Sequence, residues 1–145
     1  MSEADVARLS TDAMMAGDAA SRMLGIEVIS AGPGTAAVSM RVREDMVNGW
    51  ELCHGGLIAS LADTAFAIAC NSRGTVTVAA GFEVTFLEPG RLGDLLVAQA
   101  SELALRGRTG LYDVTVTREA DGVVIAAFRG RSRATGRTNP AVGQE

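Results

Sequence analysis

Two features near the middle of the chain have residue types that could carry out chemistry. Gly55 and Gly56 come directly before residues 57–71, a run rich in alanine and leucine, without glycine or proline, which predicts a helix. Because the first N–H groups of a helix have no partner inside it, glycines there leave backbone donors open to a carbonyl oxygen or an oxyanion. Asp63 is the only charged side chain in the run. An unpaired carboxylate is costly to bury, so its charge is either neutralised or used.

The spacing of these features limits how they can act together. Gly55 and Asp63 are eight residues apart, which is about 12 Å along a helix at about 1.5 Å per residue. An oxyanion donor acts at about 3 Å from the oxygen, and the attacking group must reach the adjacent carbon. We therefore expect one substrate to meet Gly55 of one chain and Asp63 of another, in a homodimer with antiparallel helices and two shared sites.

The rest of the chain is dominated by predicted strands. Residues 26–29 and 36–43 are separated by a glycine–proline turn and predict a hairpin. Four more strands are expected, each followed by a short turn: 75–86, 95–105, 111–119 and 123–133. A helix that is apolar on nearly every side must be enclosed. We predict an α+β fold in which a curled antiparallel sheet wraps around one long central helix, with a second copy of the chain or a substantial layer of loops covering the uncovered side.

We divide the chain into an N-terminal helical cover at residues 1–23, a main domain at 24–134 and a flexible tail at 135–145. Gly74 follows the predicted central helix and is expected to take the left-handed conformation that ends it. The length of 145 residues and the 48% hydrophobic content fit one folded domain.

Composition argues against several classes of function. The net charge of −4 disfavours nonspecific binding to nucleic acid or to an anionic membrane, and 4% aromatic residues leave few stacking platforms. No apolar run is long enough to span a membrane and no signal-peptide pattern is present, so we expect a cytoplasmic protein. Cys53, Cys70 and His54 lack metal-ligand spacing, so no metal site is expected.

Structural interpretations of the same residues stay open. Asp63 could be a structural acid neutralised by Arg41, by Arg43 or by a backbone N–H group. Its helix face carries other small or polar residues and could instead be a polar stripe at an interface: Ser60, Thr64 and Ala67. His54 could be a loop histidine that is hydrogen-bonded to the backbone.

The order of motifs resembles the PaaI-type acyl-CoA thioesterases of the hotdog superfamily. The likeness runs over residues 24–132 and is carried by Asn48 and by six segments: 54–56, 60–65, 71–74, 86–90, 107–110 and 128–132. The resemblance implies the hotdog fold, a curled sheet around a central helix, which agrees with the fold predicted from the residues. It also implies a dimer of dimers, hence a homotetramer.

The implied reaction is hydrolysis of an acyl-CoA thioester to free acid and CoA. The acyl group would be an aryl group of the phenylacetyl type or a short-to-medium chain, and CoA would be part of the substrate, not a cofactor. The expectation of an aryl group comes from the family's association with phenylacetate degradation. Residues 79–81, Ala-Ala-Gly, depart from relatives that carry a serine or threonine hydroxyl there to place the water.

Carried over residue by residue, the resemblance gives each site residue a role. Asp63 would attack the thioester or activate water, and the Gly55 N–H would polarise the thioester oxygen. Asn48 and His54 would orient the carbonyl or the water, with His54 also near the thiolate leaving group. A second set would bind substrate or lie near the CoA phosphates: Gly56, Arg91, Arg108, Thr109, Gly110 and Arg131.

Two other functions remain possible on the sequence. A hydratase or dehydratase of the same fold would use a histidine and an acid on the α and β carbons of an acyl thioester, but His54 at a helix start suits carbonyl orientation better. A non-catalytic acyl-CoA-binding module would need an output element. Residues 1–23 are acidic and too short to form a DNA-reading helix pair.

Overall fold

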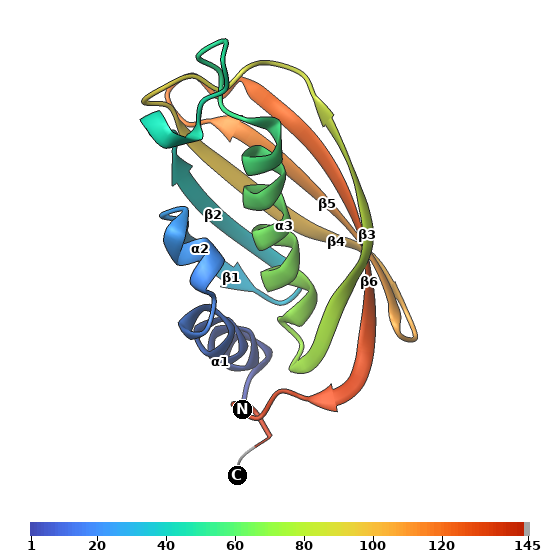
Figure 1. Cartoon of the computed structure of the whole chain (residues 1–145). Helices are drawn as coiled ribbons and strands as arrows, with labels where there is room; N and C mark the ends of the chain where they lie inside the picture. Colours follow the sequence, from blue (N-terminus) through green and yellow to red (C-terminus); the bar gives the residue numbers. More distant parts are fainter. Residues whose placement is uncertain (144–145) are drawn as a thin grey trace.

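The computed structural model describes residues 1–143 and shows one sheet that curls around a central helix (Figure 1). Helices α1 and α2 come first, the short 3₁₀ helix η1 follows β2, and the elements have these bounds: α1 Glu3–Ala16, α2 Ala19–Met23, β1 Glu27–Gly32, β2 Thr35–Arg41, η1 Glu44–Met46, α3 Gly55–Asn71, β3 Thr75–Phe86, β4 Leu95–Arg106, β5 Thr109–Arg118 and β6 Val124–Thr138. The six strands are antiparallel in the order β1-β2-β4-β5-β6-β3. The predicted hotdog architecture is thus confirmed.

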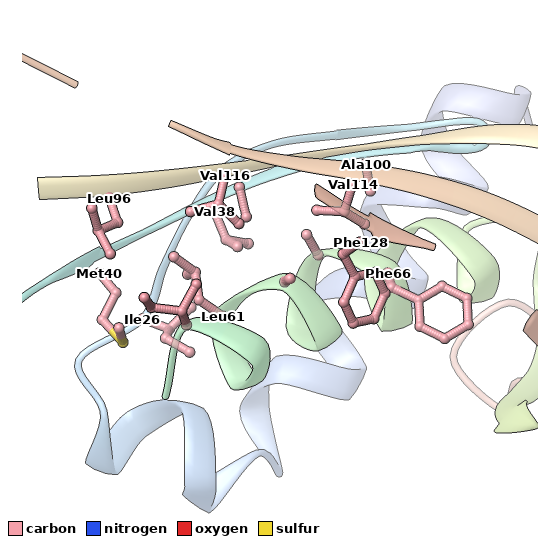
Figure 2. Close-up of a cluster of buried hydrophobic side chains, with 14 of the residues drawn as sticks. Ile26, Val38, Met40, Leu61, Phe66, Leu96, Ala100, Val114, Val116 and Phe128 are labelled. Carbon is pink, nitrogen blue, oxygen red and sulfur yellow. The ribbon is translucent and has the colours of Figure 1, made fainter. Parts of the chain in front are cut away.

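The core lies between α3 and the concave face of the sheet (Figure 2). Alternate residues of the central strands point toward the helix, so that Val38, Leu96 and Val114 are almost fully buried together with Leu61. The ring of Phe66 lies on the backbone of β6, where a Cβ on Gly130 would come within 2.8 Å of the ring. The helix is therefore seated closely on the sheet, which fixes the position of the residues on its opposite face.

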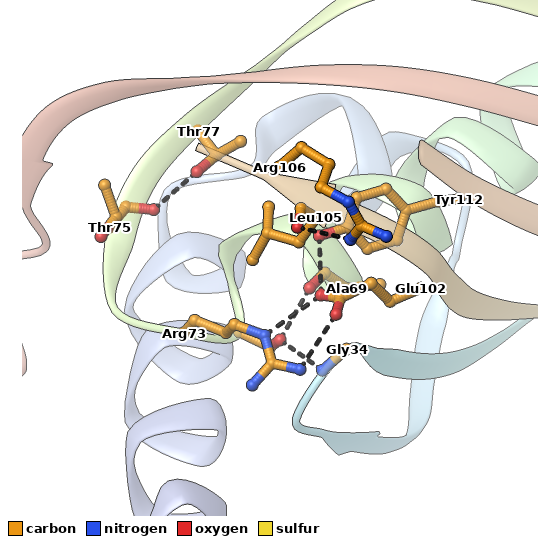
Figure 3. Close-up of polar contacts among 10 residues, drawn as sticks. Gly34, Ala69, Arg73, Thr75, Thr77, Glu102, Leu105, Arg106 and Tyr112 are labelled. Atoms are coloured by element: carbon orange, nitrogen blue, oxygen red, sulfur yellow. Dashed lines mark hydrogen bonds and ion pairs between the residues drawn. The ribbon is translucent and has the colours of Figure 1, made fainter. Parts of the chain in front are cut away.

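Polar contacts fix the C-terminal end of α3 (Figure 3). The Ser72 hydroxyl donates to the Ala69 carbonyl at 2.7 Å and accepts the Gly34 N–H at 2.8 Å, which ties the helix end to the β1–β2 turn. Arg73 pairs with Glu102 of β4 at 3.1 Å. Gly74 has φ +87°, as expected of the left-handed residue that ends the helix.

The element boundaries agree with the sequence expectations to within three residues except at the C-terminus. The hairpin, the central helix and the four later strands are all present, although α3 begins at Gly55, two residues earlier than expected. The expected tail at 135–145 is wrong in its first part, because β6 continues to Thr138 and the Thr135 hydroxyl donates to the Val76 carbonyl at 2.7 Å. Residues 144–145 of that tail lie outside the described residues.

Two helices precede the sheet. Helix α1 begins with a capping box in which Ser2 and Asp5 satisfy each other's backbone N–H groups. Helix α2 lies beside α3 on the side away from β3 (Figure 1). None of the helices in residues 1–143 has the length and hydropathy needed to cross a membrane.

Candidate active site

A cavity of about 340 Å³ opens at the N-terminal end of α3. Asn48 and Gly55 line it, and its other walls are mostly apolar: Leu52, Cys53, Ile58, Phe86, Leu87, Glu88, Pro89 and Gly90. We refer to this space as the Gly55 cavity. It brings together two of the four predicted catalytic residues, at the point where the helix presents unbonded backbone donors.

His54 forms the N-cap of α3. Its Nδ1 accepts the Gly56 N–H at 3.3 Å, so the neutral imidazole carries its proton on Nε2 in this arrangement. The Gly56 donor is therefore occupied, whereas within residues 1–143 no acceptor bonds the Gly55 N–H. Gly55 thus supplies the open donor that an oxyanion requires, and the sequence alternative of a backbone-bonded histidine is also correct for His54.

Gly55 has a packing requirement as well as an open N–H. A Cβ at this position would lie 2.9 Å from the Phe86 ring, so only glycine allows β3 and the start of α3 to approach so closely. Both residues line the Gly55 cavity. Phe86, which the sequence analysis named only as part of segment 86–90 and without a role, is therefore a site residue.

We expect Gly55→Ala to lower the free energy of unfolding by about 1–3 kcal/mol, because the added methyl group overpacks the contact with Phe86. Urea unfolding followed by circular dichroism measures the change. Gly49→Ala is the matched control, since a Cβ there meets nothing within 4 Å. Adding Phe86→Leu to the Gly55→Ala variant replaces the ring by a smaller side chain and should restore most of the lost free energy of unfolding. A double variant as unstable as Gly55→Ala alone would contradict this explanation.

Asn48 is oriented by its own loop. Its Oδ1 accepts the N–H groups of Trp50 at 2.9 Å and Leu52 at 3.2 Å, which fixes the side-chain amide. The same loop places Glu51 in the left-handed region at φ 63°. Because both bonds use the oxygen, the Nδ2 group is left to donate to a substrate carbonyl or a water.

Asp63 is half-buried on α3, and none of the described residues neutralises it. No hydrogen bond or ion pair reaches its carboxylate from any residue between 1 and 143. The proposed neutralising residues are engaged elsewhere: Arg41 donates to the Gly93 carbonyl at 3.0 Å, and Arg43 pairs with Asp45 at 3.0 Å. The interpretation of Asp63 as a structural acid neutralised by these groups is therefore wrong.

The surroundings of Asp63 favour its protonated form. Burial raises the pKa of the Asp63 carboxyl above its usual range, and the negative charge of Asp18 raises that pKa further. Asp18 is the N-cap of α2, where it accepts the Ser21 N–H at 2.9 Å. Sequence analysis missed Asp18, although aspartate is one of the residue types that commonly cap a helix.

Asp63 and Gly55 do not share a cavity within one chain. Asp63 lines a separate cavity of about 310 Å³ between α2 and α3, which we call the Asp63 cavity. This separation is what the helix geometry predicts for residues two turns apart. A single chain therefore presents the donors and the carboxylate in two places.

Thr109 and Gly110, two of the predicted CoA-binding residues, lie apart from the Gly55 cavity. Thr109 pairs with Arg133 of β6, whereas Phe86 at the Gly55 cavity pairs with Ala126 near the other end of that strand. Gly110 has a packing reason to be glycine, since a Cβ there would lie 2.5 Å from the Ser132 hydroxyl.

The arginines of this set have local contacts of their own. Arg131 pairs with Glu83 at 3.1 Å across β6 and β3, and Arg108 lies against Gly136 of β6. Arg91 lines a neighbouring cavity together with Trp50. The role of these residues at the CoA phosphates stays a prediction. Within residues 1–143 no group of three or more histidine, cysteine or acidic side chains could hold a metal ion.

Known proteins resemble this chain in sequence and in structure. The model of the Thioesterase superfamily matches residues 51–125. The acyl-coenzyme A thioesterase PaaI of Escherichia coli (strain K12) is 45% identical over 126 residues, 87% of this chain and 89% of that protein. Acyl-coenzyme A thioesterase 13 of Homo sapiens is 34% identical over 111 residues, 74% of this chain and 79% of that protein.

The comparison with solved structures agrees with the sequence comparison. The solved structure of the E. coli PaaI protein from the phenylacetic acid degradation operon superposes with a TM-score of 0.92 at 42% identity, and the match covers 95% of this chain and 99% of that chain. The likeness thus extends over nearly the whole length of both proteins and includes the helix that carries Gly55 and Asp63. The chain belongs to the thioesterase superfamily, as a hotdog-fold member of the PaaI type.

Proposed function

We propose that the protein hydrolyses an acyl-CoA thioester to a free acid and CoA, in two sites that a homodimer shares. The observation that carries the proposal is the half-buried carboxylate of Asp63, which no residue from 1 to 143 pairs, on the same helix as the Gly55 N–H, which is likewise unbonded within these residues. A globular protein keeps such a charge unpaired at a cost in stability, and perturbed acids of this kind cluster at functional sites. Membership of the thioesterase superfamily gives the reaction class.

The surface of β3 supports assembly of two chains. β3 is an edge strand, so its outer backbone groups have no neighbouring strand in the protomer. Three large apolar side chains on it are 42–51% exposed: Val78, Phe82 and Phe86. Pairing of this edge with its copy around a two-fold axis would cover these side chains and set the two α3 helices antiparallel. Asp63 of each chain would then face Gly55 of the other. A dimer of such dimers gives the homotetramer.

The proposed chemistry needs few groups. The thioester oxygen accepts the Gly55 N–H of one chain, and the Asn48 Nδ2 group helps to orient the carbonyl. The Asp63 carboxylate of the other chain either attacks the carbonyl carbon or removes a proton from the attacking water. After the C–O bond has formed, the C–S bond breaks and CoA leaves as a thiolate. Where water is the attacking group, the free acid forms directly. Where Asp63 attacks, water then hydrolyses the acyl anhydride on Asp63, which releases the free acid and restores the carboxylate. Because a thiol has a pKa of about 8.5, the leaving group needs no strong general acid.

The acyl group we propose is an aryl group of the phenylacetyl type or a short-to-medium chain, in keeping with the E. coli relative encoded in a phenylacetic acid degradation operon. Arg91, Arg108 and Arg131 are proposed to meet the phosphates of CoA, with Thr109 and the backbone of Gly56 and Gly110 as neutral donors. We propose that the enzyme works in the cytoplasm.

Release of free thiol tests the function directly. A disulfide reagent should report CoA release from a panel of aryl-, straight-chain and hydroxylated acyl-CoAs. Hydration of an enoyl-CoA, seen as loss of enoyl absorbance without thiol release, would instead identify the protein as a hydratase. Saturable acyl-CoA binding with no turnover of any substrate would identify a binding module.

The pH profile should report Asp63. Because the carboxylate must be ionised to act, kcat/KM should fall as the pH falls through the pKa of Asp63. Asp18→Asn removes a negative charge that raises this pKa, so it should shift the acidic limb to lower pH, while asparagine still caps α2. Profiles of kcat/KM for both proteins measure the shift. Asp5→Asn, which removes a capping charge from α1, should leave the limb in place, and an equal shift in that control would contradict the assignment.

A further inference from the structure

The Asp63 cavity has an unusual construction, because one wall comes from α3 and the other from the N-terminal segment. Helix α3 contributes Leu57, Ser60, Asp63, Thr64 and Ala67, and the segment around α2 contributes Asp18, Ala20, Ser21, Met23 and Leu24. Its volume of about 310 Å³ compares with the cavity of about 150 Å³ that suffices to bind benzene. It is large enough for an aryl-acetyl group.

The α2 wall is held in place from both of its ends. Asp18 accepts both the N–H and the hydroxyl of Ser21, at 2.9 and 2.6 Å, and the Ile26 N–H donates to the Ser21 carbonyl at 2.9 Å. At the other end, Arg43 donates to the Met23 carbonyl at 3.0 Å. Asp63 therefore lines a cavity whose opposite wall is fixed by hydrogen bonds, not a loose flap.

Covalent geometry relates this cavity to the substrate. If Asp63 acts on the carbonyl carbon, the two substituents of that carbon, the acyl group and the sulfur, must leave it in different directions. The pantetheine arm has to continue to the CoA nucleotide in solvent, whereas the acyl group ends. In the protomer the Asp63 cavity is bounded on two sides, by α2 and by α3, whereas the Gly55 cavity opens at the N-terminal end of α3. The Asp63 cavity therefore suits the acyl group, which does not have to continue into solvent.

We propose that the Asp63 cavity receives the acyl group and that Met23 and Leu57 limit the size of acyl group the enzyme accepts. This inference rests on the proposed thioester hydrolysis. Met23 is the last residue of α2 and Leu57 lies near the start of α3, so the two large apolar side chains line the cavity from its two walls. Met23 is 67% exposed in the protomer, so its size is not fixed by the core. It is a specificity-determining residue, with no part in the chemical step.

The test compares kcat/KM for butyryl-, octanoyl- and phenylacetyl-CoA in variants of Met23. Met23→Ala enlarges the cavity and should raise the ratio of octanoyl to butyryl activity about tenfold, the discrimination typical of a few methylene contacts. Met23→Trp should lower the same ratio by a similar factor. Loss of packing in the N-terminal segment would reduce activity on all three substrates alike, so the ratio separates specificity from a structural effect.

Two further variants complete the experiment. Ile29→Ala removes an apolar side chain of similar exposure, 58%, from β1 and should leave the ratio unchanged. Leu87→Ala enlarges the Gly55 cavity instead. A shift in the ratio in Leu87→Ala, with none in either Met23 variant, would place the acyl group in the Gly55 cavity and overturn the inference. If the wild-type enzyme releases thiol but neither Met23 variant changes the octanoyl-to-butyryl ratio, the inference is overturned and the proposed function is not. If the wild-type protein releases no thiol, the proposed function itself is overturned.

Discussion

Asp63→Asn should lower kcat for acyl-CoA hydrolysis about a thousand-fold, while the variant remains folded and assembled. The amide is nearly isosteric with the carboxylate but can neither attack the carbonyl nor accept a proton from water, and such a loss is typical of removing a general base or nucleophile. Thiol release under saturating substrate measures the effect. Asp12→Asn, an exposed acid on α1, is the matched control and should keep full activity.

The same substitution should not destabilise the fold. The pKa of Asp63 is higher in the native state than in the unfolded state, so the native state holds the proton more tightly. This proton binding stabilises the fold fully at a pH below the unfolded pKa, and the stabilisation is lost as the pH rises through the native pKa. At neutral pH the ionised side chain therefore costs stability, and asparagine removes that cost. The melting temperature of Asp63→Asn should equal or exceed that of wild type at pH 7, with the advantage vanishing in acid. Wild-type turnover in a folded variant would end the catalytic assignment.

Much of the fold follows from local patterns. The alternation of residues in β2 and β3, and glycine at positions such as Gly74, predict strands and a helix end, because the period of a strand and the left-handed conformation are local properties. The order of strands in the sheet is not local. That β3 pairs with β6 depends on packing between segments distant in sequence, and so does the continuation of β6 to Thr138, which pairs with Thr75.

The candidate site was predictable where one residue contradicts its surroundings. Asp63 stands out because it is the one charge in an apolar helix, and the structure confirms that it has no partner within residues 1–143. Asp18 could not be linked to it from sequence, because their proximity depends on how α2 packs on α3. The same is true of Phe86, whose contact with Gly55 arises only when the sheet closes around the helix.

Two inactive variants should restore each other's activity if the site is shared. Asn48→Asp keeps the oxygen that accepts the Trp50 and Leu52 N–H groups but replaces the Nδ2 donor by an acceptor, so it should be inactive with its loop intact. A mixed dimer of this variant with Asp63→Asn has one site with both residues intact. With random assembly half of the dimers are mixed, so co-expression should recover about one quarter of wild-type activity.

A second mixture tests independently whether the two chains share each active site. A double variant, Asn48→Asp with Asp63→Asn in one chain, has no intact residue to lend to a wild-type partner. Co-assembled with an equal amount of wild type, it should leave about one quarter of full activity if the site is shared, since only wild-type homodimers then work, but about one half if each chain holds its own site. Recovery in the first mixture together with about one quarter in the second requires that Asp63 and Asn48 act across the interface. No recovery, together with one half, would place Asn48 and Asp63 of each active site in one protomer and would overturn the shared site.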